Sequence, residues 1–443
     1  MTASPSTPSP GPSPGPSPGP LWAKGQVTLD SAVQRFCAAD DVIVDRELFV
    51  FDIRATAAHV QGLRRIGVLT DAEATTLDDG LQALARLWTV GSFIVDERYE
   101  DGHTAIESFL IERCGEVGKK VHTARSRNDQ VLVAARLWLK DRLQQAAALA
   151  SSAAATCLAR AEATAAVPMP GYTHLQRAMP TSLGAFFAGH AESFLDSRDA
   201  LLSAITVVDK NPLGTGAGFG VSLALDRDGV AKDLGFRDVV ISPQAAQNSR
   251  GKMELWGLQA LHLLTLDVRR LAWDLSLYAS AEFGFVRLPD AYTTGSSLMP
   301  NKRNPDVVEL LRTLPAVVEG ALAETQAVLS LPSSYHRDLQ ATKAPVVRAF
   351  GRALQGAALV PALVERLEFN EPALKAAISP DMYATDRALE LVVDGVAFRD
   401  AYRQAAAEIP TYGDRDAGLS LQQRVSLGGA GNLGLDRLRA RLA

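Results

Sequence analysis

The sequence predicts an all-α protein organised around a central bundle of long helices. Five segments of roughly twenty to forty residues are rich in helix-forming residues, which is long for helices of a small globular domain. In one of them, apolar residues recur at alternating spacings of three and four, as in the narrow seam between two packed helices. No pattern typical of a strand separates these segments.

The composition is that of an ordinary globular protein. The chain has 443 residues, 47% hydrophobic and 21% charged, which suits two or three domains with a sizeable core. Its 45 basic and 50 acidic residues give a net charge of −5, without a block of like charges. We therefore expect no nucleic-acid partner and no attraction to an anionic membrane surface.

The cysteines and the first twenty residues indicate in which cellular compartment the protein is expected. Cys37, Cys114 and Cys157 are odd in number and widely spaced, which argues against a disulfide framework and a zinc cluster and favours a reducing cytoplasm. Residues 1–20, rich in Pro, Ser and Gly, lack the apolar core of a signal peptide and are expected to be a disordered tail. No later run reaches the roughly eighteen apolar residues of a membrane span.

Residues 21–122 predict an N-terminal helical domain. Two short helical patterns begin near Leu21 and Asp45, and the second ends at Gly67; a third begins with Asp71 as N-cap. A fourth helix carries His103 and Glu107 one turn apart. Such a pair can ligate a metal, but a structural hydrogen bond is favoured because no third ligand is near, so we expect no metal site.

The first of the long helices follows a polar stretch, GKKVHTARSRNDQ. Arg125 to Asp129 therefore stand at a helix N-terminus, where free N–H groups and the helix dipole attract a carboxylate or phosphate. A solvent-exposed charge cluster would explain the two arginines but not the accompanying Ser, Asn and His. The helix runs for over thirty residues until Pro168 and Pro170 close it.

The next long helices are separated by short polar segments. Thr173 and His174 lie in a tight turn flanked by prolines, and a second long helix spans 181–210. The glycines of 211–220 suggest close backbone packing, because a phosphate loop would need a preceding strand and a lysine at the proper spacing. A third helix covers 251–283, with the seam Leu261, Leu264, Val268, Leu271, Leu275 and Tyr278.

The remaining pattern gives two more long helices and a small domain. A fourth helix follows Pro305 and a fifth spans 344–367, so that residues 123–370 form the bundle domain and 371–443 a small C-terminal helical domain. The narrow seams need partners to bury them, which predicts an obligate oligomer.

The segment Gly295 to Glu309, GSSLMPNKRNPDVVE, reads as a mobile loop entering a helix. Asn304 suits the N-cap and Pro305 the first helical turn. Two hydroxyls, the cation of Lys302 and the amide of Asn304 are side chains that can hold an anion. A polar surface loop is the plain alternative, but it predicts no particular spacing of Lys, Asn and Glu.

Five segments together resemble the argininosuccinate lyase family of the fumarase superfamily: HTARSRNDQ, GYTHLQRAMP, GSSLMPNKRNPD, LPSSYHRDLQATK and SPDMYATD. The likeness covers about residues 21–410. It implies a three-domain fumarase/aspartase-like fold and a homotetramer with a central bundle of about twenty helices. It also implies active sites assembled from three subunits and a reversible elimination that turns argininosuccinate, the small-molecule substrate, into arginine and fumarate.

The resemblance also implies roles for the matching residues. Ser296 would remove the carbon proton, His174 would supply or relay a proton to the leaving guanidinium, and Glu309 would orient His174. Lys302 and Asn304 would steady the carboxylate. The carboxylate-binding positions of the family match Ser126, Arg127, Asn128 and Thr173, and those that grip the other end of the substrate match Tyr335, Gln340 and Lys343.

Two departures from the family pattern leave the exact substrate open. A serine of an NAS-like run is replaced by Asp41, and an SDRD-like stretch is replaced by residues that include Gln247 to Lys252. Asn248, Ser249, Arg250 and Lys252 can still form an anion-binding patch. The alternatives are a related lyase that releases fumarate from another N-substituted aspartate and a non-catalytic crystallin-type homologue; NAD, PLP and metal roles find no supporting motif.

Overall fold

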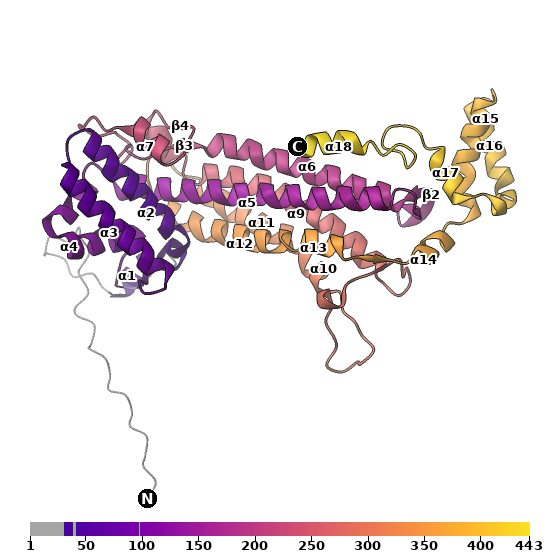
Figure 1. Cartoon of the computed structure of the whole chain (residues 1–443), viewed down its shortest axis with the longest axis horizontal. Helices are drawn as coiled ribbons and strands as arrows, with labels where there is room; N and C mark the ends of the chain where they lie inside the picture. The colour runs from indigo at the N-terminus through magenta and orange to yellow at the C-terminus, as the bar shows by residue number, and fades with distance from the viewer. Residues whose placement is uncertain (1–30, 39–40, 97) are drawn as a thin grey trace, which may run out of the picture. The chain divides into compact units, whose positions relative to one another are not determined.

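The computed structural model of the chain describes residues 31–38, 41–96 and 98–443 and divides into two compact units. Unit 1 comprises Met1–Lys140, Val208–Met253 and Ala327–Val347; unit 2 comprises Asp141–Val207, Glu254–Gln326 and Arg348–Ala443. Helices dominate both units, which confirms the predicted fold class (Figure 1). The tail predicted for residues 1–20 lies outside the described residues, and the three-domain division remains a prediction.

Unit 1 consists of helices with one very short parallel strand pair. Its helices are α1 (Ser31–Ala38), α2 (Asp41–Arg65), α3 (Asp71–Thr89), α4 (Gly102–Cys114), α7 (Arg227–Asp233) and α8 (Pro243–Asn248), with the 3₁₀ helices η1 (Gly115–His122) and η3 (Arg337–Thr342). Strands β3 (Lys210–Asn211) and β4 (Asp238–Val239) pair in parallel. The first part of helix α5 (Arg127–Ala163) also belongs to this unit.

The core of unit 1 forms where α2 packs against α3 and α4. Phe49 of α2 lies 4.6 Å from the ring of Trp88 and stacks at 5.7 Å on Phe93. Helix α2 has 25 residues and begins at Asp41, four residues before the start predicted at Asp45. The predicted N-cap Asp71 is wrong by one residue: Thr70 caps α3, and Glu73 completes a capping box by reaching back to the Thr70 N–H.

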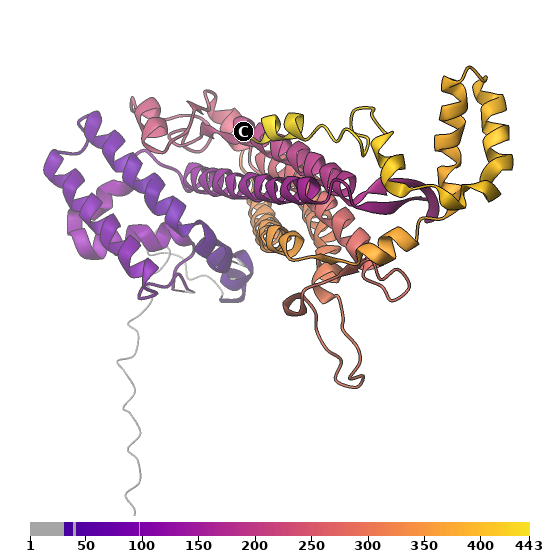
Figure 2. The same ribbon diagram turned by 45° about the vertical axis from the view of Figure 1, so that its right-hand side comes forward.

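Unit 2 contains the bundle of long helices, whose middle parts run alongside one another (Figure 2). Its helices, besides the rest of α5, are α6 (Leu183–Val208), α9 (Lys252–Tyr278), α10 (Asp306–Leu311), α11 (Leu314–Val328), α12 (Lys343–Ala357), α13 (Val360–Glu365), α14 (Glu371–Ala376), α15 (Ala384–Val393), α16 (Phe398–Glu408), α17 (Ala417–Gln422) and α18 (Leu435–Leu442). The 3₁₀ helices are η2 (Asp290–Tyr292), η4 (Pro380–Tyr383) and η5 (Ile409–Asp414), and the short strands β5 (Val286–Arg287) and β6 (Glu368–Phe369) pair antiparallel. The first residues of α9 and α12 and the last of α6 are assigned to unit 1.

The predicted seam of α9 is confirmed. Five of its members, Leu261, Leu264, Val268, Leu271 and Leu275, are buried. Helix α5 is likewise continuous over 37 residues, although it ends at Ala163, before the prolines that were expected to close it. Among the described residues, no helix is both long and apolar enough to cross a membrane.

The fourth and fifth predicted helices are each divided in two by a proline. Helix α10 ends at Leu311, four residues before Pro315, and α12 ends at Ala357, four residues before Pro361. Proline has no N–H to donate to the carbonyl four residues earlier, and its ring collides with that carbonyl. Both breaks therefore fall where the helical hydrogen-bond ladder cannot continue.

The segment predicted as a tight turn with flanking prolines is a β-hairpin. Strands β1 (Pro168–Thr173) and β2 (Gln176–Ser182) pair antiparallel, with Thr173 opposite Gln176. The two residues between them, His174 and Leu175, have φ of 54° and 57°. Two successive positive φ values match the twist of a two-residue hairpin, so the turn itself was predicted correctly but its strands were not.

Candidate active site

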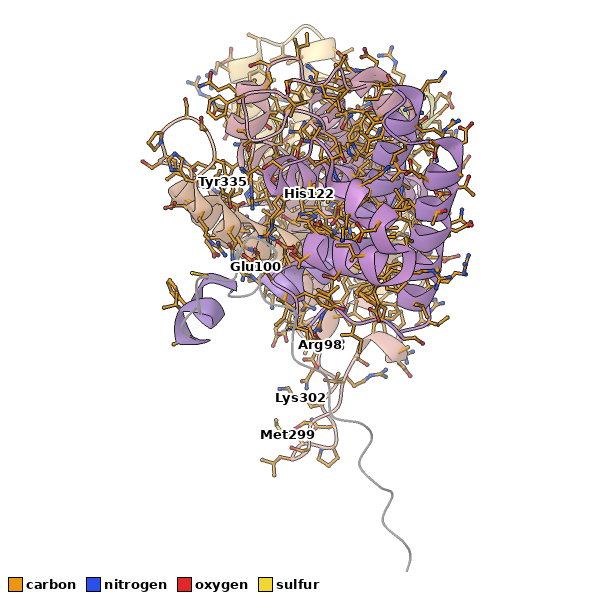
Figure 3. All side chains as sticks on the ribbon, turned by 90° about the vertical axis from the view of Figure 1, so that its left-hand side faces the viewer. Arg98, Glu100, His122, Met299, Lys302 and Tyr335 are labelled. Carbon is orange, nitrogen blue, oxygen red and sulfur yellow. The ribbon has the colours of Figure 1, made fainter. Side chains whose placement is uncertain are left out.

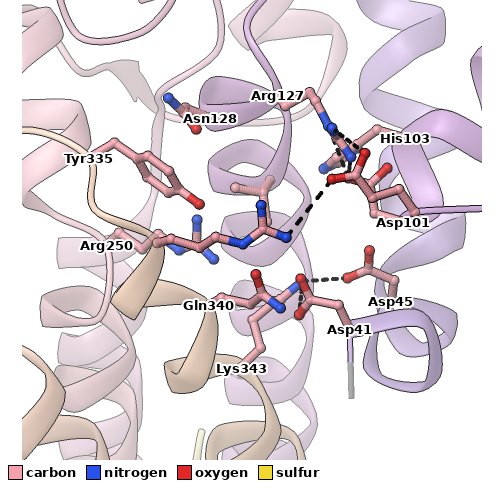
Figure 4. A pocket seen from close by; sticks show the side chains of 13 residues that line it. Asp41, Asp45, Asp101, His103, Arg127, Asn128, Arg250, Tyr335, Gln340 and Lys343 are labelled. Carbon is pink, nitrogen blue, oxygen red and sulfur yellow. Dashed lines mark hydrogen bonds and ion pairs between the residues drawn. The ribbon is translucent and has the colours of Figure 1, made fainter. Parts of the chain in front are cut away.

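A polar cavity of about 180 Å³ lies in unit 1 (Figure 4). Helix α2, the start of α4, the start of α5 and the segments around residues 250 and 335–343 each contribute side chains. Its lining residues are Asp41, Asp45, Glu100, Asp101, His103, Arg127, Asn128, Val131, Arg250, Tyr335, Arg337, Gln340 and Lys343. The cavity therefore brings together five residues that the sequence assigned to substrate binding: Arg127, Asn128, Tyr335, Gln340 and Lys343.

Arg127 is fixed at the N-terminus of α5 by carboxylates from the segment before α4. Its Nη1 donates to Glu100 at 2.9 Å and its Nε to Asp101 at 3.0 Å. Burial disfavours the charge on Arg127, but Asp101 and Glu100 outweigh it and raise the pKa of the guanidinium. For Asp101, burial is likewise outweighed by His103 and Arg127, so its pKa falls to about 2. Arg127 is therefore positively charged and Asp101 negatively charged at physiological pH.

The N-terminus of α5 is also tied to the glycine-rich segment 211–220. Asp129 accepts hydrogen bonds from the N–H groups of Gly214 at 3.1 Å and Gly216 at 2.9 Å. Both glycines have positive φ, which allows the backbone to approach the carboxylate. The predicted close packing of this segment is confirmed. Ser126 accepts the N–H of Asn128 at 3.2 Å, so it orders the turn before α5 instead of lining the cavity.

Lys343 is buried between two aspartates of α2. Its Nζ is 2.7 Å from Asp41 Oδ1 and 2.7 Å from Asp45 Oδ1. Burial disfavours the ammonium, but Asp45 and Asp41 outweigh it and raise the pKa of Lys343. The lysine is therefore charged, and its charge is already shared with two carboxylates.

The wall that includes Tyr335 contains an arginine for which the sequence gave only a weak signal. The Arg250 guanidinium lies 5.5 Å from the centre of the Tyr335 ring, and Arg250 lines the cavity. Its predicted companions in an anion-binding patch make other contacts: Ser249 accepts from Arg136 at 2.8 Å, and Asn248 accepts the Ser334 N–H at 2.8 Å. Only Arg250 of that proposed patch lines the cavity.

The hydrogen bond favoured for the pair His103 and Glu107 does not form, although each residue has another structural partner. The His103 ring pairs with Asp52, and Glu107 lies 3.6 Å from His122. The two residues thus have different partners. Within residues 31–38, 41–96 and 98–443, no group of three or more His, Cys, Asp and Glu side chains can hold a metal ion.

The predicted catalytic loop belongs to unit 2, from whose helices it projects (Figure 1). Lys302 and Met299 lie near its end, away from the helices of unit 2 (Figure 3). The Ser296 oxygen accepts hydrogen bonds from the backbone N–H groups of Leu298 at 3.3 Å and Met299 at 3.0 Å. Two N–H dipoles therefore point at the oxygen that would have to carry negative charge in a deprotonated serine.

The base of this loop is closed by a backbone bridge. The N–H of Asn304 donates to the Thr294 carbonyl at 2.7 Å, and its side-chain amide donates to the Gly295 carbonyl at 3.2 Å. The predicted N-cap role of Asn304 is therefore wrong, since Pro305 occupies the N-cap position of α10. Asn304 instead holds the two sides of the loop together.

The remaining predicted residues also lie in unit 2. Thr173 and His174 are exposed at the tip of the β1–β2 hairpin. Glu309 of α10 pairs with Arg312 at 3.4 Å. The expected hydrogen bond between Glu309 and His174 remains a prediction.

Comparison with known proteins identifies the family. A family model described as lyase matches residues 28–320. The argininosuccinate lyase of Stenotrophomonas maltophilia is 53% identical over 422 residues, covering 95% of this chain and 98% of that protein. The argininosuccinate lyase of Xylella fastidiosa is 52% identical, with 95% of each chain covered.

Solved structures show the same fold at low identity. EDDS lyase in complex with formate has a TM-score of 0.76 and 21% identity, covering 94% of this chain and 91% of that chain. The 3-carboxy-cis,cis-muconate lactonizing enzyme from Pseudomonas putida has a TM-score of 0.66 and 18% identity, covering 93% and 97%. With the sequence matches over nearly the whole chain, these findings establish that the chain belongs to the argininosuccinate lyase family of the fumarase/aspartase superfamily.

Proposed function

We propose that the chain catalyses the reversible elimination of argininosuccinate to L-arginine and fumarate. The observation that carries this proposal is the 53% identity, over 95% of the chain, with argininosuccinate lyases. It favours this reaction over the related fumarate-releasing lyase that the departures at Asp41 and Gln247 to Lys252 left open, and over a non-catalytic crystallin-type homologue. A cavity lined by both carboxylates and guanidinium groups suits a substrate that carries both charges.

The reaction breaks a C–H bond and a C–N bond and forms the double bond of fumarate. The carbon proton lies next to a carboxylate, so its removal builds up negative charge that needs fixed donors and cations. The electron pair of the C–H bond becomes the double bond, and the leaving guanidinium nitrogen takes up a proton. The enzyme therefore has to provide a base on one side and a proton donor on the other.

Ser296 is the proposed base. An alkoxide is unstable in water, and the N–H groups of Leu298 and Met299 are the donors that stabilise it on this loop. Lys302, exposed on the same loop, is proposed to move with Ser296 and neutralise the carboxylate. Closure of the loop would exclude water and strengthen both interactions.

The other proposed residues complete the acid side and the binding side. His174 supplies or relays the proton to the leaving nitrogen, and Glu309 orients it. Substrate binding is assigned to Ser126, Arg127, Asn128, Thr173, Asn304, Tyr335, Gln340 and Lys343. Ser126 and Asn304 act through the backbone segments that they hold, and Lys343 acts through the two aspartates that it contacts.

We also propose that the active enzyme is a homotetramer in the cytoplasm. Exposed apolar residues along α9 and α10 support an oligomer: Trp256, Leu263, Trp273 and Leu310 are 43%, 47%, 50% and 53% exposed. In such a tetramer, the loop of one subunit and the cavity of another contribute to one active site. Light scattering of the purified protein tests the assembly; a fully active monomer contradicts it.

The activity is tested by following fumarate absorbance with argininosuccinate as substrate. Wild type should be active, and Ser296→Ala should lose at least about a hundredfold in kcat because the base is removed. Ser297→Ala, an exposed neighbour on the same loop, is the matched control and should keep most of the activity. An inactive wild type, or a fully active Ser296→Ala, would refute the assignment.

A further inference from the structure

In one wall of the cavity, the positive charge of Lys343 is already paired with carboxylates of the protein. Lys343 lies between Asp41 and Asp45, and Figure 4 shows the three side chains together at one side of the cavity. Two carboxylates and one ammonium leave one net negative charge on this group. We name these three residues the Asp41–Lys343–Asp45 triad.

A lysine in this position is a weak partner for a substrate carboxylate. Its side chain is 8% exposed, and its ammonium is already hydrogen-bonded to both aspartates. A substrate carboxylate would have to approach two like charges at hydrogen-bond distance from its partner, and that repulsion is strong where water is excluded. The triad therefore favours a cationic group of the substrate.

Within the triad, Asp41 is the residue that can receive this cation. Asp45 uses both oxygens, one for Lys343 and the other for the Gly102 N–H at 3.0 Å. Asp41 contacts Lys343 through Oδ1, and its side chain is 16% exposed, against 6% for Asp45. Asp41 is thus the more exposed of the two carboxylates. Its Oδ2 atom forms no hydrogen bond with any of the described residues.

The same cavity also has a partner for the opposite charge. Arg250 also lines the cavity, with its guanidinium 5.5 Å from the centre of the Tyr335 ring; in Figure 4, Tyr335 and Arg250 are on the left and Asp41 is on the right. A guanidinium that faces a carboxylate across one cavity matches the carboxylate and ammonium that an α-amino acid carries on a single carbon. Argininosuccinate has such a group at its arginine end.

We propose that Asp41 is a specificity-determining residue that binds the α-ammonium group at the arginine end of the substrate. This inference rests on the proposed function and adds to it the residue that selects an amino acid over an amine-free analogue. Lys343 acts as a positioning residue, because it holds the Asp41 carboxylate next to that of Asp45 against their mutual repulsion.

The test compares two inhibitors that differ only in the ammonium group. L-Arginine and 5-guanidinopentanoate, which lacks the α-ammonium, are measured as inhibitors of wild type and of Asp41→Asn. Wild type should bind arginine about tenfold or more tightly than the analogue, as expected for loss of a hydrogen bond between charged groups. In Asp41→Asn this preference should fall to about twofold or less, whereas inhibition by fumarate stays unchanged because fumarate has no ammonium.

Asp79→Asn is the matched control, since Asp79 is exposed on α3 and does not line the cavity. It should keep the wild-type preference. Equal binding of both inhibitors by wild type would overturn the proposal even if Asp41→Asn fails to fold, and so would a folded Asp41→Asn with the wild-type preference. Failure of wild type to cleave argininosuccinate would instead count against the proposed function, and arginine binding measured by calorimetry would still decide the role of Asp41.

Discussion

The Arg312 guanidinium carbon lies 4.2 Å from the centre of the Trp273 ring, and the same guanidinium is 3.4 Å from Glu309. A cation over an indole face is held by the ring quadrupole, so Arg312 is fixed from one side by Trp273 and presents its charge to Glu309. Through Trp273 and Arg312, helix α9 is thereby connected to a predicted catalytic residue on α10.

Replacing Arg312 by methionine should therefore reduce kcat about tenfold, with KM changed by less than about twofold, because Glu309 would lose its orienting partner. Steady-state kinetics with argininosuccinate measures both parameters. The matched control is Arg348→Met, which removes an exposed ion pair with Glu324 in the same unit. Unchanged kcat in Arg312→Met would show that Glu309 does not depend on Arg312.

The stability of unit 1 should depend on pH through His59. Burial and the charge of Arg125 lower the pKa of His59 to about 3, against about 6.5 in an unfolded chain. The unfolded state therefore binds a proton below pH 6.5 that the folded state does not, so the stabilisation present at pH 7 is lost as the pH falls toward 3. Linkage gives a loss of about 2 kcal/mol between pH 7 and pH 5 from this group.

Urea unfolding at pH 7, 6 and 5 tests this dependence. His59→Gln retains a side-chain donor for the Thr123 carbonyl, which lies 2.9 Å from Nε2 in the wild type, but it does not titrate. The variant should lose less stability than wild type over this range. If the unfolding free energy of both proteins fell equally with pH, His59 would make no difference to the pH dependence of stability.

Gly251, next to Arg250 of the cavity, should not tolerate a side chain. Its φ is 77°, and a Cβ placed there would lie 2.4 Å from Leu329 Cδ2. Gly251→Ala should cost about 2 kcal/mol or more in unfolding free energy and weaken substrate binding, because either the backbone at Arg250 or Leu329 has to move. Gly320→Ala, within helix α11 and with open space around the position, should be neutral or stabilising by up to about 1 kcal/mol. Thermal melts of both variants decide the matter, and equal melting temperatures would disprove the steric argument.

The turn of the β1–β2 hairpin stores strain that a glycine can relieve. Leu175 has a φ of 57° and is 69% exposed, so its side chain gives little packing in return for an unfavourable backbone conformation. Leu175→Gly should raise the unfolding free energy of unit 2 by about 1 kcal/mol. Leu202→Gly, at an exposed position inside helix α6, should instead lower it by about the same amount. A lower melting temperature for Leu175→Gly than for wild type would contradict the claim that Leu175 is in a strained backbone conformation.

The helical architecture was predictable because its signals are local. The seam of α9 and the length of α5 follow from residues three and four apart, and both are confirmed. The breaks before Pro315 and Pro361 follow from the same local rule, and they were missed because the apolar pattern continues through them. The hairpin was missed because His174 and Leu175 are not the glycine or asparagine residues that usually adopt its turn.

The candidate site was predictable only in part. Arg127 and Asn128 were found because they stand at the N-terminus of a long helix, and Tyr335, Gln340 and Lys343 because of family motifs. Glu100, Asp101 and Asp45 were not predicted, since their roles depend on partners far away in the sequence; Lys343 and Asp45, for example, are 298 positions apart. A local signal existed for Asp101, whose side chain caps α4 by accepting the Thr104 N–H.

Pro315 has a consequence for how the loop that contains Ser296 can move. Because Pro315 has no N–H to donate to the Leu311 carbonyl, the regular hydrogen bonding of α10 does not run on unbroken into α11. The break leaves the loop attached to a short helix, α10, which Val308 and Leu311 hold by their burial. With alanine in place of Pro315, α10 and α11 could form one continuous helix. A movement of the loop that also moved α10 would then have to bend that helix.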